Sequence, residues 1–128
     1  MRLLLDTHVF LWWIAGGEEL SRRARAAIAD PAHECRLSLA SVWEMAIKAS
    51  LGKLRLPAPV ARFVPEQLAA NGFLALPIAL AHAARVEQLA WHHRDPFDRL
   101  LAAQALEEDL ALVTADPLFR RYGVRRVW

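Results

Sequence analysis

Short apolar runs alternate with longer helical segments along the whole chain, and this alternation limits the possible folds more than any other feature of the sequence. Apolar runs typical of buried strands cover residues 2–5, 35–39, 73–76, 110–114 and 124–128. Helical periodicity and helix-end signals cover residues 7–15, 21–29, 41–51, 61–70, 79–91, 117–121, and a segment from Asp95 to the acidic run 107–109. This order predicts an α/β domain in which a mostly parallel sheet of about five short strands is flanked by helices.

The chain is about the size of one ordinary domain. Its 128 residues are 55% hydrophobic and 23% charged, which is too apolar for a disordered protein, so we expect one domain over residues 1–128. The longest apolar stretch, residues 73–81, is far shorter than a membrane span. Asp6 and His8 interrupt the N-terminal leucines, which argues against a signal peptide and favours a cytoplasmic protein. The single Cys35 excludes an internal disulfide and a cysteine-based zinc site.

The charges are nearly balanced in number but clustered in position. Lysine and arginine together number 16 against 14 acidic residues. Two runs are purely basic, and they contain Arg22, Arg23 and Arg25 in one case and Arg120, Arg121, Arg125 and Arg126 in the other. Such runs fit contacts with the phosphates of a nucleic acid, although arginines of this kind on a small domain usually form an ordinary solvated surface.

Four acidic residues are expected at one edge of the predicted sheet. Asp6 follows the first apolar run, and Asp116 lies two residues past the run that ends at position 114. Glu44 and Asp98 lie near the starts of helices that follow a strand or loop on the same edge. Because ligands of parallel sheets bind beyond the carboxyl ends of the strands, the four carboxylates are expected to converge on one cleft.

Each of these acids also has a structural interpretation. Asp6 and Asp116 could cap helices, Ser41 and Glu44 fit a capping box, and acids such as Asp98 are favourable in a first helical turn. Together, however, four close carboxylates repel one another unless they share protons or a cation neutralises them. A set of oxygen ligands suits Mg²⁺ or Mn²⁺, and such an ion can activate water for hydrolysis of a phosphodiester.

Four segments resemble the PIN-domain ribonucleases, in particular the VapC toxins of bacterial toxin–antitoxin pairs. They are LLLDTHVFLWW at the start, SLASVWEMAIK in the middle, then DPFDRLLAAQA and LVTAD, and the resemblance covers nearly the whole chain. It implies a PIN-like fold, a Mg²⁺-dependent endoribonuclease activity, a homodimer, and a VapB-like antitoxin that covers the active-site cleft. The acidic metal-site residues that it implies are Asp6, Glu44, Asp98 and Asp116.

The resemblance also implies two supporting hydroxyl groups. Thr114 in the T-x-D segment would orient the site by hydrogen bonding, and the Thr7 hydroxyl would support the carboxylate of Asp6. His8 stands where many relatives have Ser or Asn, so no role is carried over to it. Asp95 either tunes the site or, as we favour, caps the helix that begins at Pro96.

Three further features have open interpretations. Arg99 beside Asp98 is expected at the rim of the cleft, where it would meet a substrate phosphate or pair with a neighbouring acid. The pair His92-His93 could suggest metal ligation, but adjacent side chains point in different directions and no third ligand has a suitable spacing, so a surface or RNA contact is favoured. The segment 9–14 is apolar on all sides of its helix and is equally consistent with a core helix and with an interface helix.

The leading hypothesis is a metal-dependent endoribonuclease acting on single-stranded or looped RNA. A non-catalytic nucleic-acid or protein-binding module, in which the acids only cap helices, is the alternative. A phosphoacceptor receiver domain fails on the positions of its residues, because only Asp6 follows the first strand and Lys48 and Lys53 lie mid-chain.

Overall fold

The computed structural model describes residues 1–128 and contains one five-stranded sheet in which every neighbouring pair is parallel. The strand order is β3-β2-β1-β4-β5, so the first strand lies at the centre. The sequence prediction of a largely parallel sheet is therefore confirmed. The strands are β1 (Arg2–Leu5), β2 (Glu34–Ser38), β3 (Leu74–Leu76), β4 (Ala111–Val113) and β5 (Arg126–Val127).

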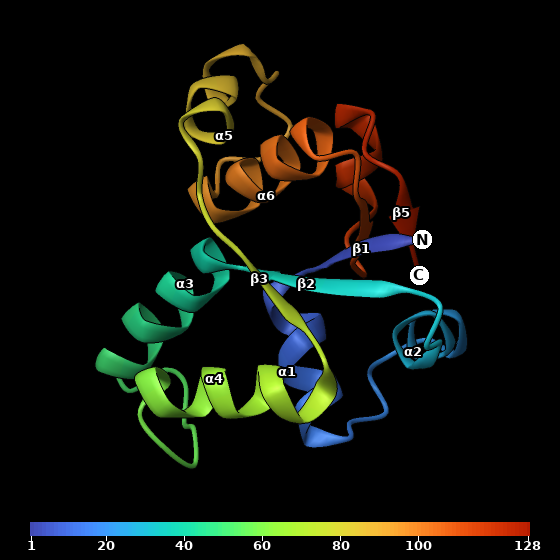
Figure 1. The fold of residues 1–128 in the computed structure, drawn as a ribbon. Helices are drawn as coiled ribbons and strands as arrows, with labels where there is room; N and C mark the ends of the chain where they lie inside the picture. The colour runs from blue at the N-terminus through green and yellow to red at the C-terminus, as the bar shows by residue number, and fades with distance from the viewer.

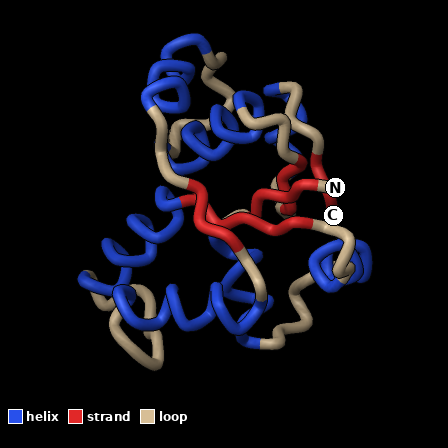
Figure 2. The backbone as a smooth tube through the Cα atoms, in the orientation of Figure 1, coloured by secondary structure: helices blue, strands red, loops and turns tan.

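Helices cover both faces of the sheet (Figure 1). Four of them, α1 (Thr7–Ala15), α2 (Arg22–Ala29), α3 (Leu39–Ser50) and α4 (Val60–Asn71), lie on one side. The other side carries α5 (Leu80–Arg85), α6 (Pro96–Glu107) and the 3₁₀ helices η1 (Val86–Gln88) and η2 (Pro117–Tyr122). The tube in Figure 2 shows the thin layer of strands between the two helical layers, with both chain ends on the same side of the molecule. No helix is both long enough and apolar enough to cross a membrane.

The central strand divides its side chains between two hydrophobic cores. Leu3 and Leu5 belong to the core under α1, α2 and α4, whereas Leu4 belongs to the core that includes Leu101 of α6. This alternation follows from the period of two in a β-strand. A continuous apolar run is therefore the sequence of a strand that is covered on both faces.

Helix α1 is partly a core helix. Val9 and Phe10 are buried, while Leu11 and Trp12 are only half-buried and pack against the edge of the same core. The helix ends at Gly16, whose φ of 68° is the left-handed conformation that favours glycine. The apolar surface of α1 is thus divided between the core and a pocket.

Two expectations about helices were wrong. Helix α3 begins at Leu39, because the Ser38 hydroxyl accepts a hydrogen bond from the Ala40 amide, so Ser41 and Glu44 form no capping box. The helix predicted over residues 79–91 is shorter. It consists of α5 and η1, and a loop then runs to Asp95.

Candidate metal centre at the carboxyl edge of the sheet

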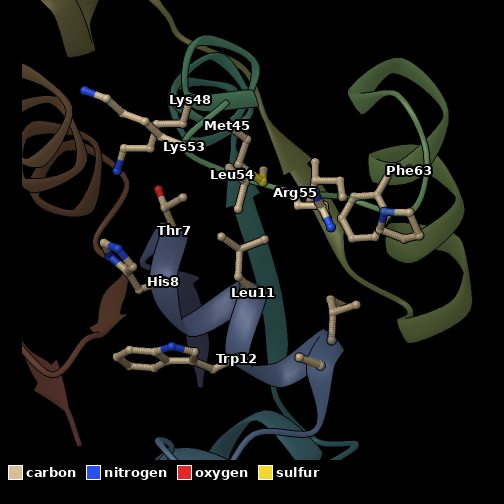
Figure 3. A pocket seen from close by; sticks show the side chains of 14 residues that line it. Thr7, His8, Leu11, Trp12, Met45, Lys48, Lys53, Leu54, Arg55 and Phe63 are labelled. Carbon is tan, nitrogen blue, oxygen red and sulfur yellow. The ribbon is translucent and has the colours of Figure 1, made fainter. Parts of the chain in front are cut away.

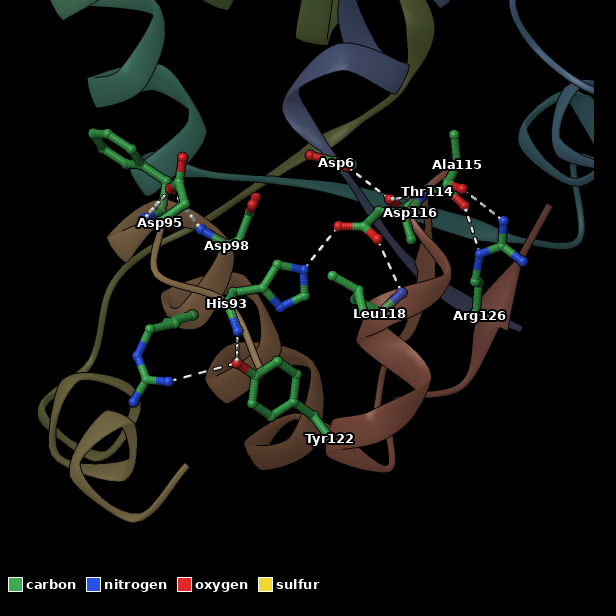
Figure 4. Close-up of polar contacts among 12 residues, drawn as sticks. Asp6, His93, Asp95, Asp98, Thr114, Ala115, Asp116, Leu118, Tyr122 and Arg126 are labelled. Atoms are coloured by element: carbon green, nitrogen blue, oxygen red, sulfur yellow. Dashed lines mark hydrogen bonds and ion pairs between the residues drawn. The ribbon is translucent and has the colours of Figure 1, made fainter. Parts of the chain in front are cut away.

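The carboxyl ends of β1 and β4 bring Asp6 and Thr114 together. The Thr114 hydroxyl donates to Asp6 Oδ2 at 2.7 Å and accepts a hydrogen bond from the Asp116 amide at 3.1 Å (Figure 4). Asp6 occupies the position before α1 but makes no capping hydrogen bond, so the capping interpretation was wrong for this residue. Burial raises the pKa of Asp6, and the Thr114 hydrogen bond partly opposes that rise. The expected contact between Thr114 and the site is thereby present.

Asp116 follows β4 and has a donor on each carboxylate oxygen. Oδ1 accepts from the Leu118 amide at 2.9 Å, which is the helix cap expected for this residue. Oδ2 accepts from His93 Nε2 at 2.8 Å. Partial burial acts to raise the pKa of Asp116, but the His93 and Leu118 hydrogen bonds and the nearby positive charge of Arg126 outweigh it. The pKa of Asp116 therefore lies below its ordinary value.

His93 is the site residue that the sequence analysis missed. Its side chain is buried against Phe119 and Tyr122, and the Tyr122 hydroxyl accepts a hydrogen bond from the His93 amide. Nδ1 is buried without a hydrogen-bond partner, while Nε2 points to Asp116. The interpretation of this histidine as a surface residue was wrong. The adjacent His92 gave no distinguishing signal, because only the path of the loop decides which of the two rings turns inward.

Asp98 lies in the first turn of α6, which begins at Pro96 after a capping residue. Asp95 Oδ1 accepts from the amides of Phe97 and Asp98, so the capping interpretation of Asp95 is confirmed. The pKa of Asp98 is raised to about 7 by burial first, and then by the negative charges of Asp95, Asp6 and Glu44, against which His93 acts. Three carboxylates thus lie close enough to Asp98 to disfavour its charged form.

The ligand atoms of His93, Asp98 and Asp116 all lie within 4.8 Å of one another. One imidazole nitrogen and two carboxylate oxygens are a donor set that divalent cations accept. Burial is the largest cause of the raised pKa of both Asp98 and Asp6, and neighbouring carboxylates add to it; a bound cation would stabilise the charged form of each. By the chemistry of their donor atoms, these residues fit a divalent metal.

Glu44 is a buried residue of α3 and has an internal partner. Its side chain is 9% exposed, and Oε2 accepts from Lys48 Nζ one helical turn later at 2.8 Å. The hydrogen bond with Glu44 raises the pKa of Lys48, and the charges of Asp95 and Asp98 raise it further. Of the four predicted acids, Asp98 and Asp116 therefore form the compact group with His93, while Glu44 is paired with a lysine beside it.

Two supporting residues have roles other than those expected. The Thr7 hydroxyl donates to Ser41 Oγ at 2.8 Å, so it ties α1 to α3 instead of bonding Asp6. Arg99 is 3% exposed and does not reach the rim of the cleft.

The Arg99 guanidinium instead lies 3.8 Å from the centre of the Trp91 ring and donates to the carbonyls of Val86, Leu89 and Ala90. These bonds shape the loop before His93, and they explain why the helix predicted over residues 79–91 ends early. Because its guanidinium is occupied by these contacts, Arg99 has a structural role.

The basic runs are also partly structural. Arg126 donates to the carbonyls of Thr114 and Ala115, which supports the loop that carries Asp116. Arg25 donates to the Gly17 carbonyl at the end of α1. Buried or half-buried backbone carbonyls need donors, and these arginines supply them.

The sheet, its acidic edge and the buried histidine describe an α/β domain with a candidate metal centre. The family profile described as PIN domain matches residues 3–125. Ribonuclease VapC22 from Mycobacterium tuberculosis is 33% identical over 94% of this chain and 91% of its own length. Ribonuclease VapC16 from the same organism is 42% identical over 47% of this chain and 43% of its own. The chain therefore belongs to the PIN domain family, among relatives of the VapC type.

Solved structures agree on the fold. A crystal structure of VapBC2 from Rickettsia felis bound to a promoter DNA fragment has a TM-score of 0.72 at 14% identity and covers all of both chains. A DNA-bound VapBC structure from Salmonella typhimurium has a TM-score of 0.69 at 21% identity and covers 98% of this chain and 96% of that one.

Proposed function

We propose that this protein is the endoribonuclease toxin of a VapBC-type pair and that it hydrolyses RNA phosphodiester bonds in the cytoplasm with a divalent cation, Mg²⁺ or Mn²⁺. The observation that carries the proposal is the group of His93, Asp98 and Asp116, whose ligand atoms lie within 4.8 Å of one another at the carboxyl edge of a PIN-domain sheet. The names of the curated relatives, which are ribonucleases of the VapC type, support the choice of RNA as the substrate.

In this proposal, Asp98, Asp116 and His93 hold the cation, and Asp6 and Glu44 complete the acidic cleft. The bound ion supplies activation of water and stabilisation of the negative charge that develops on the phosphate. The Thr114 hydroxyl holds one oxygen of Asp6, so the direction of that carboxylate is set before substrate binds. Asp6 is then placed to accept a proton from the attacking water.

The proposal includes two protein partners. One is a VapB-like antitoxin, in line with the VapBC assemblies named for the solved structures of similar fold. The other is a second copy of the chain, for which exposed apolar side chains of α3 offer a surface. Leu39 is 41% exposed and Trp43, one turn later, is 59% exposed. In this proposal the two exposed side chains form part of the contact with the second copy.

The direct test uses purified protein freed of any antitoxin and a mixture of single-stranded RNAs. Cleavage is expected with Mg²⁺ or Mn²⁺ and is expected to stop when a chelator is added. Expression of the parent is expected to arrest growth, and expression of Glu44→Gln is expected not to. If the parent cleaves no RNA under any of these conditions, the protein is instead a binding module whose acids serve only its structure.

A separate prediction concerns His93. Replacing it with Gln is expected to lower the rate of RNA cleavage roughly 10–100-fold, the usual loss when a residue that orients or completes a metal site is removed. The matched control is His92→Gln, because His92 makes only an edge contact with Tyr122 and is absent from the group. Gel-based cleavage assays of the two variants should therefore separate them. Equal losses of cleavage rate in the two variants would show that cleavage depends on the loop that carries both histidines and not on the His93 ring.

A further inference from the structure

A pocket of about 700 Å³ opens beside the acidic cleft, between α1, the end of α3 and the loop that leads to α4 (Figure 3). Thr7 and Lys48 belong to its lining, and they connect it to the cleft. Thr7 directly follows Asp6, and Lys48 bonds Glu44. The pocket therefore adjoins the group of acidic residues.

The pocket has an apolar interior and a basic rim. Leu11, Trp12 and Leu54 are among its apolar lining residues. Each of its four ionisable residues is basic or can become so, and none is acidic: His8, Lys48, Lys53 and Arg55. The chain as a whole has nearly as many acidic as basic residues, so a lining without acids favours an anionic ligand. Lys48 and Lys53 are the only lysines of the sequence.

The directions of these side chains define a path. In Figure 3, Lys48 and Lys53 extend to the same side as the Thr7 hydroxyl and the His8 ring, whereas Arg55 lies farther along the pocket near Phe63. Met45, Leu54 and Leu11 lie between these two positive ends, and the Trp12 ring lies below the His8 ring. A polyanion that leaves the cleft would meet positive charge, then an apolar surface, then positive charge again.

We propose that this pocket is a nucleotide-binding subsite of the ribonuclease. An unpaired base of single-stranded RNA next to the scissile phosphate lies on the apolar interior, and its flanking phosphates contact Lys48 and Lys53 at the cleft and Arg55 at the far end. The inference rests on the proposed ribonuclease function and deepens it by assigning the residues that bind the strand.

Three physical arguments support this occupant. The volume lies in the range of pockets that hold small organic groups. Single-stranded nucleic acids are bound by a positive groove that follows the backbone and by aromatic rings on which bases stack, and the half-buried ring of Trp12, 5.9 Å from the His8 ring, offers such a surface. The Lys48 ammonium has three donors, so its bond to Glu44 leaves donors for a phosphate.

The test compares two pocket variants with two matched controls. Ala15→Trp fills the pocket from an exposed position at the end of α1, so no packed side chain is removed, and Lys53→Met removes one rim charge. Ala29→Trp makes the same change at the exposed end of α2. Arg85→Met removes a charge from α5, on the opposite face of the sheet.

Binding is measured by fluorescence anisotropy with a labelled, mixed-sequence, single-stranded RNA 12-mer, in an Asp98→Asn background that does not cleave it. Ala15→Trp is expected to raise the dissociation constant roughly tenfold, the scale of losing one stacked base. Lys53→Met is expected to lower the slope of log affinity against log salt by about 0.7, the value for one phosphate contact on a single strand. Both controls should behave like the background protein.

A second measurement determines which nucleotide of the RNA occupies the pocket. Moving one abasic position along an RNA that the parent cleaves should weaken binding most strongly next to the cleavage site, and this penalty should disappear in Ala15→Trp. If the parent cleaves RNA while both pocket variants bind it like the controls, the subsite is overturned and the ribonuclease function stands. The same holds if the variants keep RNA affinity and lose only antitoxin binding, because the pocket would then be a protein-binding groove. Failure of the parent to cleave any RNA would instead overturn the function itself.

Discussion

Asp98→Asn is expected to abolish RNA cleavage while making the metal-free protein more stable. Its carboxylate belongs to the compact group with His93 and Asp116, so its loss removes a ligand and lowers the cleavage rate roughly 10³-fold, which corresponds to several kcal/mol of lost charge stabilisation. The same carboxylate is half-buried among Asp95, Asp6 and Glu44, which raise its pKa to about 7 after the larger effect of burial. Neutralising it removes repulsion, so the melting temperature should rise.

The opposite signs of these two effects make the prediction specific. Most substitutions that destroy activity through misfolding lower stability, whereas a neutralised acid in a functional cluster should lower activity and raise stability. The matched control is Asp95→Asn, which also removes a negative charge near Asp98 but keeps the oxygen that caps α6. It should raise the melting temperature slightly and retain most of the cleavage. Parental cleavage by Asp98→Asn would refute the assignment of the metal centre.

The acidic edge could be predicted from sequence because parallel strands end at a common edge. Asp6 and Asp116 follow apolar runs typical of buried strands, and the structure pairs those strands in parallel with Leu5 opposite Val113. The contact between Thr114 and Asp6 follows from the same register. Sequence patterns can thus predict the site residues whose positions are set by the geometry of the strands.

Site residues whose positions are set by loops could not be predicted in this way. His93 enters the site only because the loop after η1 turns its ring inward, and that loop is held by Arg99 from the next helix. The sequence presents Arg99 as a neighbour of Asp98, but one step along a helix turns a side chain by about 100°, away from the cleft and into the interior. The capping box predicted for Ser41 and Glu44 was wrong because Ser38, three residues earlier, caps the helix instead.

The Lys48 pair changes the interpretation of the four predicted acids. Glu44 shares the cleft with the metal group, yet its charge is already balanced by an ammonium 2.8 Å away. Neither Asp6 nor Asp98 forms an ion pair, and burial, as the largest cause, raises the pKa of both, so a cation would act there by stabilising their charged forms. A cation is therefore expected on the His93 side of the acidic group and not beside Lys48.

The stability of the metal-free protein should fall as the pH rises from 5.5 to 8. In the folded chain the pKa of Asp98 is about 7, against an ordinary value of 3.8, so the folded state keeps a proton that the unfolded chain has already released. A raised carboxyl pKa contributes stability at low pH, and this contribution is lost as the pH passes from about 4 through about 7. Asp6 acts in the same direction. The low pKa of Asp116 and the high pKa of Lys48 contribute little change within this range.

Divalent cations should reverse this loss, because they bind the ionised carboxylates of the folded state. At a Mn²⁺ or Mg²⁺ concentration about 100 times the dissociation constant, linkage gives about 2.7 kcal/mol, or roughly 10 °C in melting temperature for a domain of this size. The shift should be large at pH 8 and small at pH 5.5, where a proton already occupies Asp98. Differential scanning fluorimetry of chelator-treated protein checks both arms, with Asp98→Asn as the control in which the pH dependence and the metal shift are both reduced. A metal shift of equal size at the two pH values, or one retained in Asp98→Asn, would place the cation elsewhere in the protein.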